Sequence, residues 1–391
     1  MQQVAIVSAV RTGIGSFLGS LKQFTAVELG ASAISAAIER AHITSADVED
    51  VVMGNVLQAG SGQNPARQAA LQAGLPVTTT AMTINQVCGS GLKAVHLACQ
   101  SIMLGEHKIV VAGGMESMSN APHVLRDGRL GSKMGDMKLI DSMAHDGLWC
   151  SIEHVHMGIT AENIARKFGI SREAMDSYAY ESSRKALAAN GRFDDEMIEL
   201  VLNKGKKNEV SYCKDEHIRD DSSLEKLARL KPAFLENGSI TAGNSSGIND
   251  GAAALVLMSL EEAASRGIKP LAIIRGNASA GVEPSLMGLG PVPAIKDALQ
   301  RAGLQEGDID LVELNEAFAA QAIAVESHFT FPKQNINVNG GAIALGHPIG
   351  ASGARILVSL VHELRRRENK HGLAALCIGG GQGVATIIEA V

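Results

Sequence analysis

Several residue types are scarce in this 391-residue sequence, and their scarcity limits the classes of partner and function that the protein can have. Aromatic residues make up only 3%, with one Trp and three Tyr, so few rings are available for single-stranded nucleic acid to stack on. The formal net charge is -6, which leaves no basic excess to attract a phosphate backbone or an anionic membrane. We therefore expect neither nucleic acid nor a membrane surface as a partner.

Cysteine and long apolar runs are also scarce. The five cysteines include no Cys-x-x-Cys pair, and their number is odd, so neither a disulfide framework nor a metal site is indicated. No apolar stretch approaches the roughly 20 residues that span a bilayer. The apolar run 4–10 has no preceding Lys or Arg, which is typical of a first strand and not of a signal peptide. We expect a cytoplasmic protein.

Hydrophobic residues, at 46%, and glycine, at 42 residues, are plentiful. The sequence also contains an internal repeat. Residues 37–43 and 298–304 have similar sequences 261 positions apart. The Gly-rich turns at 89–91 and 350–353 each open an apolar helix that leads to a β-branched run and a Gly cluster, at an offset of 262. Two merely similar α/β units would not keep so constant an offset, so we favour a duplication.

Each half alternates β-branched runs with amphipathic helices, which predicts an α/β fold with mostly parallel sheets and crossover helices. Residues from about 120 to 246 have no counterpart in the second half and are interpreted as an insertion. The expected domains are 1–119 plus 247–268, an inserted loop domain at 120–246 that covers the site, and 269–391. The apolar run 252–258 would return the chain to the first sheet, leaving a crevice between the halves and the insertion.

Cys88 and His347 are the first candidates for chemistry. Cys88 lies between an apolar run and a predicted helix, where free N–H groups and the helix dipole favour a thiolate. His347 precedes the corresponding turn of the second half, so the repeat would make the imidazole face the thiol, and a Cys–His pair activates a nucleophile. Taken singly, either residue could instead be structural, a buried core thiol or a capping histidine.

Two more polar residues follow predicted strands of the second half. Cys377 ends a strand and precedes three Gly, where a thiol could serve as an acid or base. A buried strand-end cysteine is the alternative. Asn315 follows the strand 309–314, and active sites of α/β proteins collect side chains at such carboxyl ends. An N-cap for the next helix is the alternative for Asn315, and both roles can hold at once.

Four segments together resemble the catalytic loops of the thiolase family. They are Val-Cys-Gly-Ser-Gly at 87–91, Asn-Glu-Ala-Phe at 315–318, Asn-Gly-Gly-Ala-Ile-Ala-Leu-Gly-His-Pro at 339–348 and Cys-Ile-Gly-Gly-Gly at 377–381. The resemblance covers essentially the whole chain. It implies a thiolase-like α/β fold, with duplicated βαβαβαββ halves packed as layered sheets and helices and with an inserted loop domain. Gly13, Cys150 and Ser245 depart from the family pattern, but none lies in a catalytic loop.

The resemblance also implies an acetyl-CoA C-acetyltransferase activity, the reversible Claisen condensation of two acetyl-CoA to acetoacetyl-CoA and CoA. Cys88, activated by His347, would carry the acetyl group in a ping-pong mechanism, and Cys377 would remove the α-proton of the second acetyl-CoA. One oxyanion site would use His347 and a water held by Asn315, and the other the N–H groups of Cys88 and Gly379. No cofactor is expected, because coenzyme A is part of the substrate.

The resemblance assigns a further set of residues to substrate and CoA binding. They are His156, Met157, Arg219, Phe234, Ala242, Ser246, Met287 and Phe318. His156 and Met287 resemble residues that close the pocket in the short-chain branch of the family, which acts on acetoacetyl-CoA. The loop 127–141 resembles the segment that joins two dimers, so a homotetramer is expected, with a solvated loop on a dimer as the alternative.

Three other functions are considered beside this one. A broader-range 3-ketoacyl-CoA thiolase of fatty-acid degradation would differ only in acyl chain length. A decarboxylating ketosynthase shares a duplicated fold and Cys–His chemistry but should lack the second thiol, so Cys377 argues against it. A non-catalytic acyl-CoA carrier could lose Cys88 or His347 without penalty, whereas all four loops are intact here.

Overall fold

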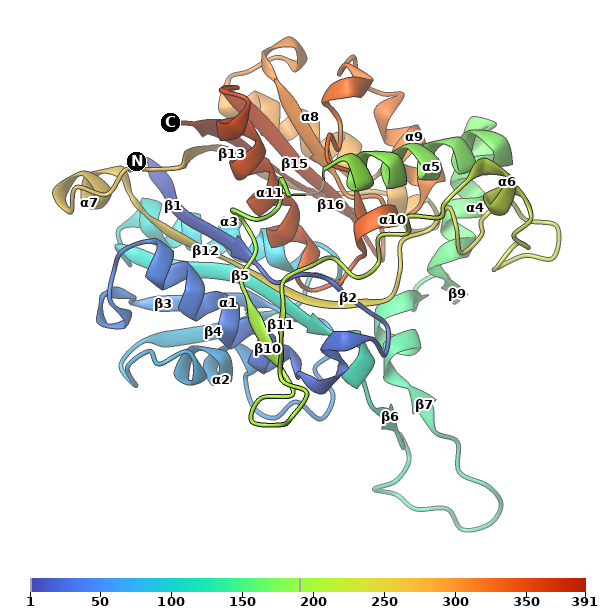
Figure 1. The fold of residues 1–391 in the computed structure, drawn as a ribbon. Coiled ribbons are helices and arrows are strands. Elements are labelled where there is room, and N and C mark those ends of the chain that lie inside the picture. The colour runs from blue at the N-terminus through green and yellow to red at the C-terminus, as the bar shows by residue number, and fades with distance from the viewer. Residues whose placement is uncertain (1, 190) are drawn as a thin grey trace.

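A mixed sheet of ten strands runs through the molecule (Figure 1). The structure is a computed structural model that describes residues 2–189 and 191–391. The strands of the sheet are β1 (Val4–Arg11), β2 (Gly15–Ser16), β3 (Asp50–Gly54), β4 (Thr80–Ile84), β5 (Ile109–Ser117), β12 (Asn249–Ser259), β13 (Ala272–Gly281), β14 (Leu311–Leu314), β15 (His371–Ile378) and β16 (Gln382–Ala390). Their order is β14-β15-β16-β13-β1-β12-β5-β3-β4, with β2 paired to β12.

The strand order repeats, as the sequence repeat predicts. In the first half β3, β5, β12 and β1 are neighbours, and in the second half β14, β15, β16 and β13 follow the same order with the same relative directions. The two halves meet where β1 pairs with β13, at Ala5↔Ile273 and Ile6↔Ala272. The sheet is therefore two similar halves joined edge to edge.

The prediction of mostly parallel sheets was wrong. Among the described strands only β3/β4, β3/β5 and β14/β15 pair in parallel, and the other pairs of the large sheet are antiparallel. Strands buried on both faces read as continuous apolar runs whatever their direction, so the pattern could not decide it. A tight turn through Gly380 and Gly381, both with positive φ, joins β15 directly to β16 and makes that pair antiparallel.

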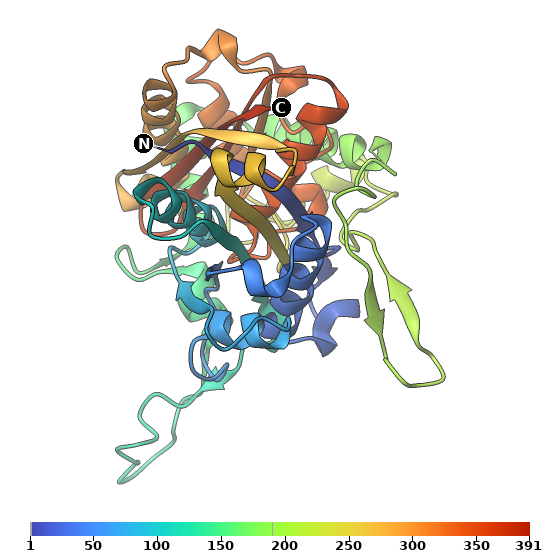
Figure 2. The same ribbon diagram turned by 90° about the vertical axis from the view of Figure 1, so that its left-hand side faces the viewer.

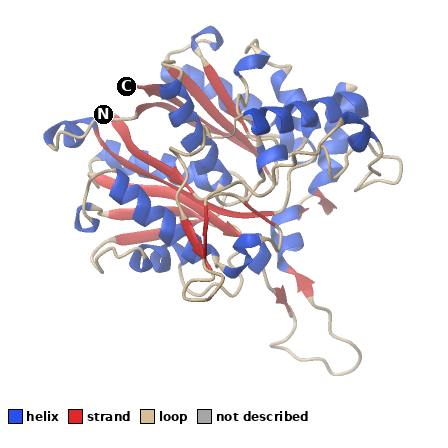
Figure 3. Ribbon diagram, in the orientation of Figure 1, coloured by secondary structure: helices blue, strands red, loops and turns tan. Residues whose placement is uncertain are grey.

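Helices cover the outer faces of the two halves of the sheet, and further helices lie between the halves (Figure 3). The helices of the two halves are α1 (Ala26–Arg40), α2 (Pro65–Gln72), α3 (Ser90–Leu104), α7 (Leu260–Ser265), α8 (Pro291–Ala302), α9 (Ala319–Glu326), α10 (Ala342–Leu345) and α11 (Ser352–Arg366). One core packs α1 and α2 on the first half, and another packs α8 and α9 on the second. The remaining core holds α3 and α11 between the two halves. The order of layers is thus helix, sheet, helix, sheet, helix.

The insertion packs on both halves. Its elements are β6 (His123–Val124), β7 (Ile140–Asp141), β8 (Trp149–Cys150), β9 (Val155–His156), α4 (Met157–Phe168), α5 (Arg172–Ala188), β10 (Leu200–Leu202), β11 (Val210–Tyr212) and α6 (Leu224–Ala228). Strands β10 and β11 lie against the core of the first half (Figure 1). Helices α4 and α5 pack against α9 of the second half. The loop between β6 and β7 projects far from the body of the molecule in both views (Figures 1 and 2). β12 then returns the chain between β1 and β5.

One helical window in the described chain, Val87–Leu104, is long and apolar enough by length and composition to cross a membrane. It includes α3, and 56% of it is buried inside the fold. Since α3 lies in the central layer, we interpret the window as a core helix.

Candidate active site

Two glycines let the central helices α3 and α11 touch at their starts. A Cβ at Gly91 would stand 2.7 Å from the backbone nitrogen of Ala354, and one at Gly353 would overlap the backbone nitrogen of Leu92. Gly91 and Gly353 are the equivalent residues of the repeat. The contact therefore brings together the segments that precede the two helices, which carry Cys88 and His347.

The turn before α3 is held in an unusual conformation. Val87 has φ 46°, which is rare for a β-branched residue and persists only where the surroundings enforce it. Ser90 supplies part of that restraint, because its hydroxyl donates to the Val87 carbonyl at 2.6 Å and accepts from the Gln86 N–H at 2.8 Å. The strained turn presents Cys88, whose surface stays partly exposed.

Burial dominates the acidity of Cys88. It raises the pKa of the thiol to about 11, although the backbone N–H groups of Gly379 and of Cys88 itself lower it. The sequence pattern predicts that the helix N-terminus favours the thiolate, and the structure differs because desolvation outweighs these dipoles. The same two N–H groups, from Cys88 and Gly379, are the predicted oxyanion donors, and both favour a negative charge on the thiol sulfur.

His347 is buried and neutral. Its Nδ1 lies 2.6 Å from Ser352 Oγ, and the Ser352 hydroxyl donates to the Pro348 carbonyl at 2.9 Å. Because that hydroxyl proton is already used, Ser352 accepts from His347 Nδ1–H, which assigns a lone pair to Nε2. Burial, assisted by the charge of Arg355, lowers the pKa of His347 to about 3. The ring is therefore arranged as a base at Nε2.

Asn315 lies beside this nitrogen. Its Nδ2 is 3.5 Å from His347 Nε2, and its Oδ1 is buried without a hydrogen-bond partner in the described chain. The His347 backbone N–H donates to Asn249 Oδ1 at 2.9 Å, which fixes the loop. Among the described residues, 2–189 and 191–391, no hydrogen bond joins the Cys88 thiol to the His347 ring. The predicted direct Cys–His pair is thus not formed in this structure.

Cys377 is buried at the end of β15, and Cys88 is close enough for its charge to affect the pKa of Cys377. Burial first, and then the neighbouring Cys88, raise the pKa of the Cys377 thiol above its usual range. It packs in one cluster with Met157, Met287 and Phe318, three of the predicted substrate-binding residues. The second thiol therefore lies near Cys88 and in the same cluster as three of the predicted substrate-binding residues.

Aromatic contacts extend this cluster. The rings of His156 and Phe234 stack with centroids 4.6 Å apart, and Phe234 meets Phe318 edge-on at 6.2 Å. Gly158 is required there, because a Cβ would overlap the Phe234 ring. His156 also accepts the Gly158 N–H at Nδ1, which caps the start of α4. The insertion thus supplies His156 and Phe234 to this aromatic wall, and the second half supplies Phe318.

Arg219 and Ala242 lie in a neighbouring cavity of about 250 Å³, together with Lys226. Ile343 lines this cavity and also belongs to the cluster around Cys377, so the two spaces are adjacent. Ser246 is close by, since its N–H donates to the carbonyl of Ala317, the residue before Phe318. The predicted binding residues therefore gather in two connected groups, one apolar at the thiols and one with cationic side chains further out.

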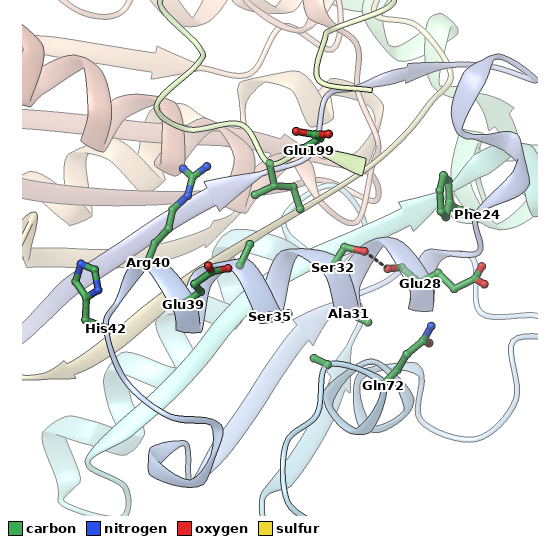
Figure 4. A pocket seen from close by; sticks show the side chains of 13 residues that line it. Phe24, Glu28, Ala31, Ser32, Ser35, Glu39, Arg40, His42, Gln72 and Glu199 are labelled. Atoms are coloured by element: carbon green, nitrogen blue, oxygen red, sulfur yellow. Dashed lines mark hydrogen bonds between the residues drawn. The ribbon is translucent and has the colours of Figure 1, made fainter. Parts of the chain in front are cut away.

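A larger cavity of about 820 Å³ lies elsewhere. Figure 4 shows it along the polar face of α1, where Glu28, Ser32, Glu39 and Arg40 face Glu199 of the insertion. It contains none of the predicted site residues. Size alone would therefore indicate the wrong place for the chemistry.

Four residues outside the predicted catalytic and binding set support the site. They are Glu116, Asn249, Glu316 and Ser352. Glu316 accepts from Ser182 Oγ at 2.7 Å, Asn337 Nδ2 at 2.8 Å and Ile343 N at 3.2 Å, and so ties the Asn315 loop to the segment before His347. A polar residue directly after an apolar strand was the available signal for Glu116 and Glu316. Asn249 and Ser352 offered no comparable signal.

The comparison with known proteins agrees with this geometry. The family model for the thiolase N-terminal domain matches residues 4–261, and that for the thiolase C-terminal domain matches 268–390. The acetyl-CoA acetyltransferases of Cupriavidus necator and Escherichia coli are each 56% identical to the chain, over 391 and 392 residues. The match covers 100% of this chain in both cases, and 100% and 99% of the relatives.

Solved structures have the same fold. The acetyl-CoA acetyltransferase of Bacillus anthracis superposes with a TM-score of 0.98 at 46% identity, covering 100% of this chain and 99% of that one. Human mitochondrial 3-ketoacyl-CoA thiolase superposes with a TM-score of 0.97 at 45% identity, with the same coverage. Because its two family models together cover nearly the whole chain, and its relatives match it end to end, the chain belongs to the thiolase family.

Proposed function

We propose that the protein is an acetyl-CoA C-acetyltransferase that condenses two acetyl-CoA to acetoacetyl-CoA and CoA, and runs the reverse reaction. The observation that carries this proposal is the presence of two thiols at one site with a neutral His347, the partly exposed Cys88 and the buried Cys377. One thiol suits an acyl carrier and the other a base. A ketosynthase or a simple carrier would have no use for the second.

In the first half-reaction the Cys88 proton passes to His347 Nε2, and the sulfur attacks the acetyl carbonyl. The bond to the CoA sulfur breaks, and the departing CoA thiolate takes the proton of Cys377. The enzyme then holds an acetyl-Cys88 thioester and a Cys377 thiolate. The N–H groups of Cys88 and Gly379 would hold the thioester carbonyl, since both already favour a negative charge on the Cys88 sulfur.

In the second half-reaction the Cys377 thiolate takes an α-proton from a second acetyl-CoA. The resulting carbanion attacks the acetyl-Cys88 carbonyl, Cys88 leaves, and the proton on His347 returns to it. A protonated His347, with a water held by the unpartnered Oδ1 of Asn315, would stabilise the enolate oxygen. One such preorganised donor is worth roughly 3 kcal/mol of barrier.

The binding residues divide the substrate between two regions. His156, Met157, Phe234, Met287 and Phe318 would enclose the acyl end, as their packing around Cys377 supports. Arg219 would meet the phosphates of CoA in the outer cavity, with Ala242 and Ser246 beside the pantetheine arm. Cations at the outer end and an apolar inner end suit a charged carrier with a small acyl group.

The test of this function is chemical trapping. The protein is mixed with acetyl-CoA labelled in the acetyl group, quenched, digested and mapped by mass spectrometry. We expect the label on Cys88, with release of one CoA per chain. Label on Cys377, or on no cysteine, would contradict the proposal. The Cys88→Ala variant is the control.

Similarity to human mitochondrial 3-ketoacyl-CoA thiolase supports a second candidate, a broader-range 3-ketoacyl-CoA thiolase. The packing of Met287 and Phe318 in one buried cluster with Cys377 favours the short chain. Thiolysis of acetoacetyl-CoA and of 3-ketohexadecanoyl-CoA separates the two. We expect kcat/KM to be at least tenfold higher for the short substrate. A mismatch of one methylene in an apolar pocket already changes kcat/KM by about tenfold or more. Equal values would favour the broader enzyme.

We also infer the division into 1–119 plus 247–268, 120–246 and 269–391, and a homotetramer. The return of β12 between β1 and β5 supports the first. The projecting loop, in which Leu130 and Met134 are 88% and 92% exposed, supports the second, because such side chains suit a contact with another subunit. The cytoplasm is the compartment that we expect.

A further inference from the structure

Glu116 is a buried carboxylate at the end of β5 that the reaction above does not use. Its residue exposure is zero, and four donors surround it. Oε1 accepts from Asn55 Nδ2 at 2.8 Å and Leu57 N at 3.2 Å. Oε2 accepts from Val56 N at 3.1 Å and Gly350 N at 2.9 Å. Both oxygens are thus fully used as acceptors.

The four donors belong to two segments that border the site from opposite halves. Residues 55–57 follow β3 in the first half, and Gly350 lies in the turn that joins His347 to Ser352. Val56 and Leu57 form a cluster with Ile349 against which Cys88 packs. One carboxylate therefore connects the wall beside the thiol with the turn that carries the imidazole.

The backbone around this carboxylate leaves no room for another arrangement. A Cβ at Gly350 would stand 2.7 Å from Glu116 Oε2 and 2.9 Å from the Met115 carbonyl, and one at Gly114 would overlap the Gly350 carbonyl. The turn is seated directly on the end of β5. Its height above the strand is set by the hydrogen bond from Gly350 to Glu116.

Every contact of the carboxylate is a donor, so a proton on either oxygen would face an N–H group. Protonation would therefore displace at least one of the four bonds. Burial raises the pKa of Glu116 to about 7, with the N–H groups of Val56, Leu57 and Gly350 lowering it and Asp250 of β12 raising it. The charged or titratable groups that face it are Asp250 and the Cys88 thiol.

We propose that Glu116 is a positioning residue for the acyl transfer, whose ionised carboxylate fixes the position of the Cys88 wall relative to the His347 turn. Cys88 and His347 are not hydrogen-bonded in this structure, so their approach depends on the backbone that carries them. Glu116 acts through that backbone and touches neither reacting atom. The inference rests on the proposed function, since it concerns acylation of Cys88.

The experiment compares the wild type with Glu116→Gln in single-turnover acetylation of Cys88 at different pH values. The side-chain amide of the variant places an NH2 group, with two donors, against two of the N–H groups that donate to Glu116 in the wild type. We therefore expect the turn to shift and acylation to slow about 100-fold, as a shift of about 1 Å between reacting groups does. KM for acetyl-CoA should change little, because no binding residue is touched. The wild-type rate should rise between about pH 6 and about pH 8 as Glu116 ionises, and this rise should be absent in Glu116→Gln.

Matched controls separate positioning from general damage. Glu162→Gln neutralises another buried carboxylate, which accepts only from Ser239 and Ile240. It should keep the rise near neutral pH. Should Glu116→Gln fail to fold, the wild-type profile decides, and a rate that is flat across this range overturns the proposal. A folded Glu116→Gln with the wild-type rate and profile overturns it too. A wild type that never acetylates Cys88 refutes the proposed function instead.

Discussion

At the scale of single residues, burial decides the protonation state of the site. Desolvation raises the pKa of Cys88 to about 11 and lowers that of His347 to about 3, so both are neutral at pH 7. A thiolate–imidazolium pair is not the resting state. In the proposed reaction, the thiolate forms only as its proton passes to His347.

This state predicts the pH dependence of Cys88 alkylation by iodoacetamide. Because the raised pKa leaves little thiolate at neutral pH, the rate should keep rising about tenfold per pH unit through pH 9. Peptide mapping identifies the alkylated cysteine, and Cys88→Ala provides the background. A rate that levels off below pH 8 would mean a stabilised thiolate and would contradict the structure.

The two thiols should be separable by mutation. In Cys377→Ala we expect Cys88 to acetylate at near the wild-type rate, while condensation falls about 10²- to 10⁴-fold, the usual contribution of a general base. The measurements are single-turnover labelling and steady-state formation of acetoacetyl-CoA. Equal loss of both half-reactions would show that Cys377 acts through structure.

At the scale of elements, the contact between α3 and α11 places the two loops. Both helices begin with a Gly-Ser-Gly-like turn, and the second glycine of each, Gly91 and Gly353, lies against the backbone of the other helix. The duplicated sequence thus produces a duplicated contact. The two helix starts are close because neither carries a side chain at the crossing.

We therefore expect Gly353→Ala to destabilise the protein by roughly 1–3 kcal/mol, the usual effect of overpacking a core. The added methyl has no space, since it would overlap the Leu92 backbone nitrogen. Gly307→Ala is the matched control, because nothing lies within 4 Å of its Cβ. Thermal unfolding measures both, and equal midpoints would argue against a tight contact.

At the scale of the whole molecule, an edge strand and a loop with apolar side chains lie at the surface. β4 is one of the two edge strands of the large sheet, and the loop between β6 and β7 exposes Leu130, Met134 and Leu139. Edge strands and exposed apolar loops both favour association between subunits. The low net charge of -6 offers little repulsion against it.

Deleting residues 130–138 should convert the expected tetramer into a dimer that keeps its activity, since no catalytic loop lies in that range. Multi-angle light scattering measures the mass of the intact and shortened proteins. A tetramer that survives the deletion would refute the role of the loop. A mass of one chain for the intact protein would refute the assembly itself.

The sequence by itself determined the family and the duplication, and it indicated the residues that we propose to carry the chemistry. Cys88 beside Gly89, Cys377 shortly before three glycines, and His347 before a turn are local signals, because a loop that approaches a substrate needs small residues near the reactive side chain. Tertiary structure alone decided the strand directions, the neutral state of Cys88 and His347, and the four bonds of Glu116. Each of these depends on desolvation or on partners distant in the chain, such as Gly350, 234 positions from Glu116. No local pattern encodes which distant groups become neighbours.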